Sequence, residues 1–210
     1  TAEPVAAVAD KPVFDTYKLM TFGGKKVAFV GISTPETLVK STPTYFQDKF
    51  GNYIYDFCND STGDKLYKAV QTAVDAAKKA GADYVVAVAH LGDDKASAPW
   101  TSMDVIKNTK GIDVLMDGHA HSTVVKSVKS KDGKSIKMVA TGTKLENIGK
   151  IVIAENGTTV EYSVSISMKG QIFGFEDWVA GVEGQEPDMT FYEPVGWASS
   201  NTGAHFLKAF

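Results

Sequence analysis

Three short apolar runs alternate with amphipathic segments along the first half of the chain. They lie at 25–33 (KKVAFVGIS), 82–90 (ADYVVAVAH) and 112–119 (IDVLMDGH). Each is a continuous apolar run rather than a strict alternation, which is typical of parallel strands covered on both faces. The runs therefore predict three strands of one sheet.

The segments between these runs have the pattern of helices. In the first, 60–82, Asp60 or Ser61 can cap the start and Gly81 ends the helix. The second is shorter and is predicted to run from near Pro99 to Gly111. One apolar stripe is expected on the first helix, formed by Leu66, Val70, Ala73, Val74 and Ala77.

After residue 122 the pattern changes to alternating apolar residues around two turn signals, Asp132-Gly133 and Asn156-Gly157. Each signal predicts an antiparallel hairpin. The fold class is therefore α/β: a mostly parallel sheet with crossover helices that passes into antiparallel hairpins. We expect one domain over 13–167, followed at 168–210 by a tail rich in glycine and aromatic residues that shows no clear period.

Composition excludes several classes of function. The 22 cationic residues are all lysine, so the bidentate guanidinium contacts that read a nucleic-acid duplex are absent. No apolar run reaches the length of about 18 residues that spans a bilayer. Cys58 is the only cysteine, which excludes an internal disulfide and a cysteine metal cluster. The chain starts without Met and without a signal peptide, which suggests a fragment or a processed segment.

Three of the four histidines stand at predicted strand ends. His90 ends the second run, and His119 and His121 follow the third. Carboxyl ends of adjacent parallel strands lie about 4.8 Å apart, so these rings can meet at one edge of the sheet. If the segment is extended, His119 and His121 project to the same side and can serve one metal ion or one each of two. A single histidine at a strand end, such as His90 taken alone, is more often a hydrogen-bonding loop residue. His205 stands isolated in the tail, and we expect it to be structural or incidental.

The same residues carry a resemblance to a known family. The stretches VVAVAHLG and IDVLMDGHAHS, with GISTPET upstream, resemble the calcineurin-like metallophosphoesterases, most closely their 5′-nucleotidase branch, which includes 2′,3′-cyclic-nucleotide 2′-phosphodiesterases. The resemblance covers about residues 13–155 and implies a partial metallophosphatase α/β sandwich. It also implies a secreted, periplasmic or cell-surface location and a nucleotide or small phosphoester as substrate.

The resemblance assigns roles to the three histidines. His90 and His119 match two ligands of one divalent ion, and His121 matches a ligand of a second ion. Zn²⁺, Mn²⁺ and Fe²⁺ all suit such imidazole ligands. Asp117 either accepts an N–H from one of the rings and orients it, or is a solvated or capping aspartate.

Other parts of the family's site are missing from the expected place. Its Asp-x-His, Gly-Asp and Gly-Asn-His-[Asp/Glu] motifs precede the strand at 25–33, and none is found in the 24 residues before Lys25. Gly51-Asn52 in FGNYIYD superficially matches the last motif, but Tyr53 replaces the histidine and we interpret the pair as a turn. The catalytic residues thus stay unassigned. We expect the chain to supply only part of a dimetal site and to need an N-terminal fragment to complete it.

Two classes of function remain open. The first is the hydrolysis of nucleotide phosphoesters, of 5′-nucleotidase or cyclic phosphodiesterase type, in the intact protein, with this chain inactive alone. The second is a non-catalytic binding module with one structural or adventitious metal ion. A lesser alternative is a mononuclear zinc hydrolase in which Asp93 or Asp94 reaches a metal-bound water, although both are more typical of solvated loop charges. The aromatic residues of 169–210 are expected to pack in a core or an interface rather than to stack on a base.

Overall fold

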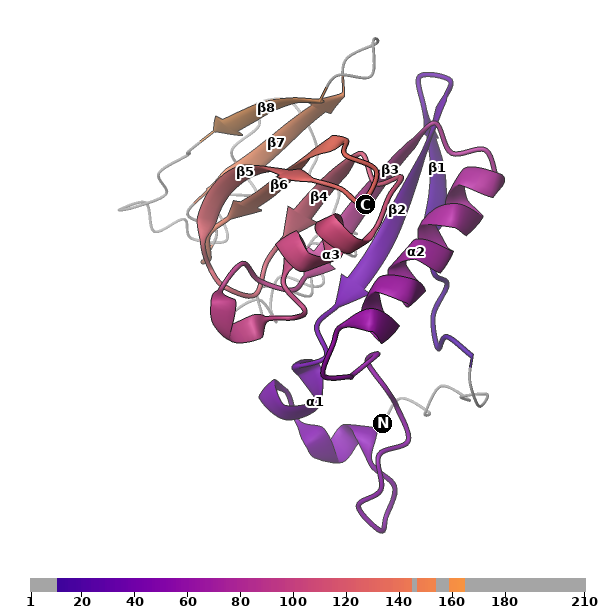
Figure 1. Cartoon of the computed structure of the whole chain (residues 1–210), viewed down its shortest axis with the longest axis vertical. Helices are drawn as coiled ribbons and strands as arrows, with labels where there is room; N and C mark the ends of the chain where they lie inside the picture. The colour runs from indigo at the N-terminus through magenta and orange to yellow at the C-terminus, as the bar shows by residue number, and fades with distance from the viewer. Residues whose placement is uncertain (1–10, 145–146, 154–158, 165–210) are drawn as a thin grey trace, which may run out of the picture.

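The apolar runs form the centre of a mixed six-stranded sheet. The structure, a computed structural model, describes residues 11–144, 147–153 and 159–164. The sheet has the order β1-β2-β3-β4-β6-β5 (Figure 1), and a separate hairpin pairs β7 with β8. Its strands are β1 (Lys18–Phe22), β2 (Lys25–Ser33), β3 (Tyr84–His90), β4 (Val114–Asp117), β5 (Thr123–Lys129) and β6 (Ser135–Thr141); the hairpin is β7 (Ile148–Ile153) and β8 (Thr159–Val164).

The strand directions confirm the predicted α/β class. Strands β2, β3, β4 and β6 are parallel neighbours, whereas β1 and β5 run antiparallel at the two edges. The predicted hairpin at Asp132-Gly133 is the β5–β6 turn, where Gly133 has the positive φ of +81° that such a turn favours. The predicted hairpin at Asn156-Gly157 is the antiparallel pair β7–β8, whose turn lies outside the described residues.

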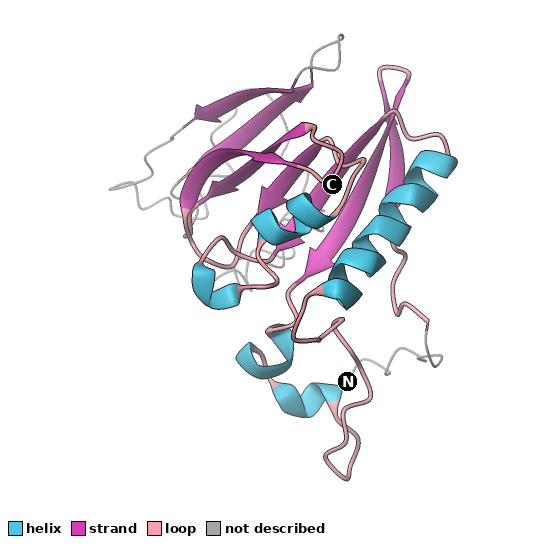
Figure 2. Cartoon of the chain, in the orientation of Figure 1, coloured by secondary structure: helices cyan, strands magenta, loops and turns pink. Residues whose placement is uncertain are grey.

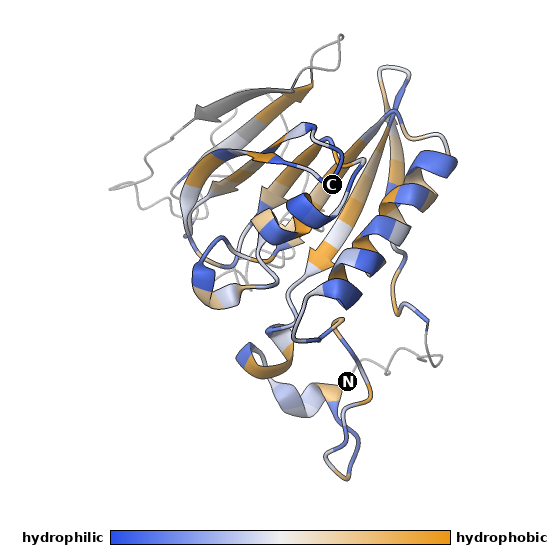
Figure 3. Ribbon diagram, viewed as in Figure 1, coloured by the Kyte–Doolittle hydropathy of each residue, from blue (hydrophilic) through white to orange (hydrophobic). Residues whose placement is uncertain are grey.

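Two helices cover one face of the sheet (Figure 2). Helix α2 (Asp64–Lys79) buries the five residues of the predicted stripe against the strands, and its polar positions alternate with them along the helix (Figure 3). Asp60 caps the first turn from outside the helix, because its carboxylate accepts the N–H of Lys65 at 2.9 Å. Gly81 follows the end of the helix with a φ of +90°.

The second helix starts later than the sequence predicts. Helix α3 (Ser102–Asn108) begins after Thr101 rather than near Pro99. The reason is a capping box: the Thr101 hydroxyl accepts the N–H of Asp104, and the Asp104 carboxylate accepts the N–H of Thr101 in return. Shorter helical turns are α1 (Thr37–Lys40), η1 (Pro43–Phe46) and η2 (Lys95–Ser97).

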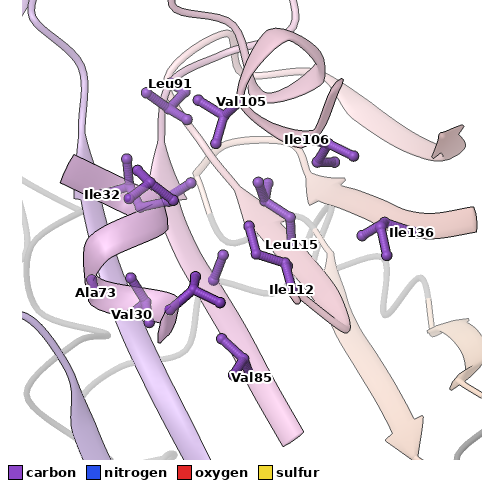
Figure 4. Close-up of a cluster of buried hydrophobic side chains, with 14 of the residues drawn as sticks. Val30, Ile32, Ala73, Val85, Leu91, Val105, Ile106, Ile112, Leu115 and Ile136 are labelled. Atoms are coloured by element: carbon purple, nitrogen blue, oxygen red, sulfur yellow. The ribbon is translucent and has the colours of Figure 1, made fainter. Parts of the chain in front are cut away.

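The core lies between this helical layer and the sheet. Leu115 and Ile112 are buried at its centre, with Val85 from β3 and Val105 and Ile106 from α3 around them (Figure 4). A smaller cluster on the other face contains Val86 and Val114, and Ile151 and Ile153 of β7 pack against it. The central strands are thus covered on both faces, which explains their continuous apolar sequences.

The predicted turn at Gly51-Asn52 is present. Gly51 has a φ of +86°, and the Asp48 carboxylate accepts the N–H groups of Phe50 and Asn52. Along the described ranges, no helix combines the length and the apolar character that crossing a membrane requires. Two predictions concern segments outside the described residues: the N-terminal residues, interpreted as the start of a fragment or processed segment, and the tail at 168–210.

Candidate metal centre

The carboxyl ends of β2, β3 and β4 meet at one edge of the sheet. Ser33, the last residue of β2, is the register partner of His90, the last residue of β3. The chain leaving β2 stays beside β3, because the N–H of Thr34 donates to the carbonyl of His90 at 3.0 Å. Asp117 ends β4 on the other side of β3. Residues that follow these three strands are therefore brought together by the sheet itself.

His90 and His119 form the centre of this edge. Nε2 of His90 lies 3.3 Å from Nδ1 of His119, and the two rings meet edge to face with centroids 4.9 Å apart. Desolvation by burial, and then the charge on His119, lower the pKa of His90 below its ordinary value. The neutral imidazole that results is the form that binds metal ions.

Two glycines make room for these rings. A Cβ on Gly118 would lie 3.3 Å from Nδ1 of His90, and a Cβ on Gly92 would lie 3.2 Å from Cδ2 of His119. Both distances are tighter than ordinary van der Waals contact. A side chain at either position would therefore press on one of the two imidazoles.

The backbone of the GHAH segment is not extended, so that expectation is wrong. His119 and His121 have φ values of +78° and +56°, in the left-handed region that non-glycine residues seldom adopt. The N–H of Ala120 donates to the carbonyl of Gly118 at 3.1 Å, which makes His119 the central residue of a three-residue turn. This turn directs the His119 ring toward β3.

His121 does not join the His90–His119 contact. Its side chain is exposed, and it hydrogen-bonds to no other side chain in the described part of the chain. Within residues 11–144, 147–153 and 159–164, no three His, Cys, Asp or Glu side chains are grouped so as to hold a metal ion. The role of His121 as a ligand stays a prediction, and His205 lies outside the described residues.

The Asp117 carboxylate stabilises the loops at this edge by accepting hydrogen bonds from them. Its Oδ1 accepts the N–H groups of Leu91 at 2.9 Å and Gly92 at 3.3 Å, and its Oδ2 accepts the hydroxyl of Ser102 at the start of α3. Burial raises the pKa of Asp117, although these hydrogen bonds oppose the rise. No histidine is among these hydrogen-bond donors, so the predicted contact of Asp117 with a ring is not seen.

Asp93 and Asp94 also have local partners. Asp93 accepts hydrogen bonds from the Ser122 hydroxyl at 2.7 Å and from Nζ of Lys126 at 3.0 Å. Asp94 caps η2 by accepting the N–H of Ala96 at 2.9 Å. Both carboxylates thus stabilise loops, and Asp93 links the loop after β3 to β5.

Sequence reasoning missed Glu36. It follows β2 by three residues, and its Oε2 lies 2.7 Å from Nε2 of His119. Burial alone would raise the pKa of the Glu36 carboxyl, but hydrogen bonds from Lys40, Ser97 and His119 together hold this pKa below its ordinary value. The sequence could have indicated Glu36, because residues that follow β2 lie at the same carboxyl edge of the sheet as those that follow β3 and β4.

Comparison with known proteins gives a consistent picture of the fold. No protein-family model matches the chain. The trifunctional nucleotide phosphoesterase protein YfkN of Bacillus subtilis (strain 168) is 28% identical over 113 residues, which are 52% of this chain and 6% of YfkN.

Solved structures resemble a larger part of the chain. The sulfate thiohydrolase SoxB of Thermus thermophilus has a TM-score of 0.55 at 18% identity, covering 76% of this chain and 26% of SoxB. A 5′-nucleotidase precursor from Thermus thermophilus has a TM-score of 0.53 at 19% identity, covering 74% of this chain and 30% of that protein. The Haemophilus influenzae NAD nucleotidase NadN has a TM-score of 0.51 at 16% identity, covering 70% and 29%.

At these identities the solved structures establish the fold, and this chain corresponds to less than a third of the length of each of these relatives. The chain thus shares the α/β fold of solved 5′-nucleotidases and, over part of their length, resembles the 5′-nucleotidase branch of the calcineurin-like metallophosphoesterases.

Proposed function

We propose that this chain forms part of the active site of a metal-dependent phosphoester hydrolase that acts on nucleotides. His90 and His119 are ligands of one divalent ion, and His121 is a ligand of a second. The observation that carries the proposal is the 3.3 Å separation of Nε2 of His90 and Nδ1 of His119 at the carboxyl edge of the sheet. The YfkN relative, by its name a nucleotide phosphoesterase, supports the substrate class.

The two imidazoles fit a metal ion. Two nitrogens that both lie about 2.0–2.1 Å from one tetrahedral Zn²⁺ are about 3.3 Å apart. His90 and His119 have that separation, and the lowered pKa of His90 keeps its ring neutral. When bound, an ion such as Zn²⁺, Mn²⁺ or Fe²⁺ polarises phosphoryl oxygens and acidifies a bound water. The chain's own contribution is to hold neutral ring nitrogens in place beside the two glycines.

This chain supplies only part of the site. Two adjacent dications repel each other unless a bridging anion lies between them. Among the described residues, no carboxylate is grouped with both His90 and His119 so as to hold a metal ion. We propose that an N-terminal fragment, or the corresponding part of a longer precursor, carries the remaining ligands and the catalytic acid or base. Residues 13–167 would then be the carboxyl half of the catalytic domain, with 168–210 as a separate tail and a secreted, periplasmic or cell-surface location.

One observation favours a second candidate. A separation of 3.3 Å is also that of a hydrogen bond between two imidazoles, and the described residues bring no third histidine, cysteine or carboxylate into a metal-binding group with them. On this alternative the chain is a non-catalytic binding module that holds one structural or adventitious ion.

Metal binding and turnover in matched variants separate the two candidates. We expect the purified chain to bind Zn²⁺ with a stoichiometry near one, and His119→Ala to abolish this binding while His205→Ala leaves it unchanged. We expect no turnover of bis(p-nitrophenyl) phosphate or AMP by the chain alone, with or without Mn²⁺ or Zn²⁺. Substoichiometric Zn²⁺ that His119→Ala does not affect would favour the binding module. Turnover by the isolated chain that His119→Ala abolishes would confirm the hydrolase and refute the partial site.

A further inference from the structure

The Glu36 carboxylate is held in place by three donors. Its Oε2 lies 2.7 Å from Nε2 of His119 and accepts the Ser97 hydroxyl at 2.9 Å, and its Oε1 forms an ion pair with Lys40 at 2.9 Å. The Glu36 and His119 side chains are 11% and 15% exposed, so water competes little for this contact. The ion pair with Lys40 and the hydrogen bond from Ser97 hold Glu36 as a carboxylate, which acts only as an acceptor.

An acceptor at this position decides where the His119 proton lies. Because an ionised carboxylate has no hydrogen to donate, Nε2 of His119 must carry the N–H of their hydrogen bond. In the neutral ring the lone pair then lies on Nδ1, the atom that faces Nε2 of His90. Glu36 therefore selects the tautomer in which His119 presents a free nitrogen to His90.

Glu36 also fixes the orientation of the ring. Rotation of the imidazole by 180° would exchange Nδ1 with Cδ2 and Nε2 with Cε1, so that carbons would face both His90 and Glu36. The hydrogen bond to Glu36 opposes this rotation. Asp117 cannot replace it, because its hydrogen bonds go to Leu91, Gly92 and Ser102.

We propose that Glu36 is a positioning residue that prepares His119 for metal binding through Nδ1. The proposal rests on the proposed function, in which His119 is a metal ligand. Carboxylates that accept the second ring N–H of a metal-bound histidine fix its tautomer and raise its basicity, and their loss weakens metal binding by roughly 10- to 100-fold. Glu36, which comes from a different strand end than His119, has the geometry for this role.

The test compares Glu36→Gln with Asp75→Asn, which removes an exposed carboxylate on α2 in the same way. The first measurement is the tautomer of His119 in the metal-free chain, from long-range ¹H–¹⁵N correlation spectra. We expect the Nε2–H tautomer in the wild type and in Asp75→Asn, and a mixture of tautomers in Glu36→Gln. The second is the Zn²⁺ affinity by competition with a chromogenic chelator, where we expect a loss of roughly 10- to 100-fold for Glu36→Gln and none for Asp75→Asn.

The two measurements test the role of Glu36 and the proposed metal function separately. An Nδ1–H tautomer in the wild type, or unchanged tautomer and Zn²⁺ affinity in a folded Glu36→Gln variant, would overturn the positioning role of Glu36. If the wild-type chain binds no Zn²⁺ although Glu36→Gln changes the tautomer, Glu36 still selects the His119 proton position and the proposed metal function fails instead. Circular dichroism of each variant establishes that it is folded.

Discussion

The carboxylate of Asp117 accepts the backbone N–H of Leu91 at 2.9 Å, which joins the end of β4 to the end of β3. The same carboxylate also accepts the N–H of Gly92 and the hydroxyl of Ser102, and Leu91 and Ser102 are fully buried. Without it the N–H groups of Leu91 and Gly92 would lose this acceptor, and the Ser102 hydroxyl would keep only the carbonyl of Gly92 at 3.3 Å.

Asp117→Ala should therefore lower the free energy of unfolding by about 2–4 kcal/mol, because buried donors left unpaired keep their desolvation cost. Urea denaturation followed by circular dichroism measures this loss. Asp117→Asn keeps one acceptor oxygen and should lose less. Equal stability of wild type and Asp117→Ala would show that water replaces the carboxylate at no cost.

Gly118→Ala should disturb the metal centre without unfolding the protein. The added Cβ would lie 3.3 Å from Nδ1 of His90, so the ring must move by a few tenths of an ångström. We expect the Zn²⁺ affinity to fall by roughly tenfold, since small displacements of ligands weaken metal sites. Gly31→Ala in β2 is the matched control, because its Cβ would meet no atom within 4 Å. The same Zn²⁺ affinity in both variants would contradict the prediction.

Asp93 should make the stability depend on acid pH. The hydrogen bond from Ser122, together with Lys126, lowers the pKa of Asp93 in the folded protein, although burial opposes this. A folded pKa below the unfolded value stabilises the protein above the unfolded value of about 4, and this contribution is lost as the pH falls through the folded pKa.

The stability difference between wild type and Asp93→Asn should therefore be largest at neutral pH and shrink below about pH 4. Urea titrations at several pH values measure it. Lys126→Met removes one partner of the same carboxylate and should show part of the same pH dependence. A difference that stays constant down to about pH 2 would rule out this coupling.

Leu115→Ala should be strongly destabilising. Leu115 is completely buried in β4 at the centre of the core, so truncation removes apolar contacts and leaves a cavity. We expect a loss of about 3–5 kcal/mol in the free energy of unfolding. Val125→Ala on the edge strand β5, where the side chain is 45% exposed, should cost less than about 1 kcal/mol. Similar losses of unfolding free energy in the two variants would show that Leu115 is not at the centre of the core.

The elements with strong local signals were predicted well. The strand predicted at 25–33 is β2 (Lys25–Ser33), and the apolar stripe predicted for the first helix is the buried face of α2. Hydrophobic periodicity reports burial directly, so it identifies such elements without knowledge of their neighbours. The start of α3 was misplaced because Pro99 and the Thr101 capping box both favour helix initiation, and only the observed hydrogen bonds identify the one used.

By itself, the sequence determined the three central strands β2, β3 and β4, the two helices between them, the two hairpins that follow, the edge of the sheet where His90 and His119 lie, and the family resemblance. These depend on periodicity, on turn residues and on the rule that strand ends meet at one edge. The tertiary structure decided that Glu36 contacts His119, that Asp117 accepts backbone N–H groups, and that His121 takes no part in the contact between His90 and His119. Those contacts join residues up to 83 positions apart and depend on left-handed turns in the loops, which no local pattern specifies.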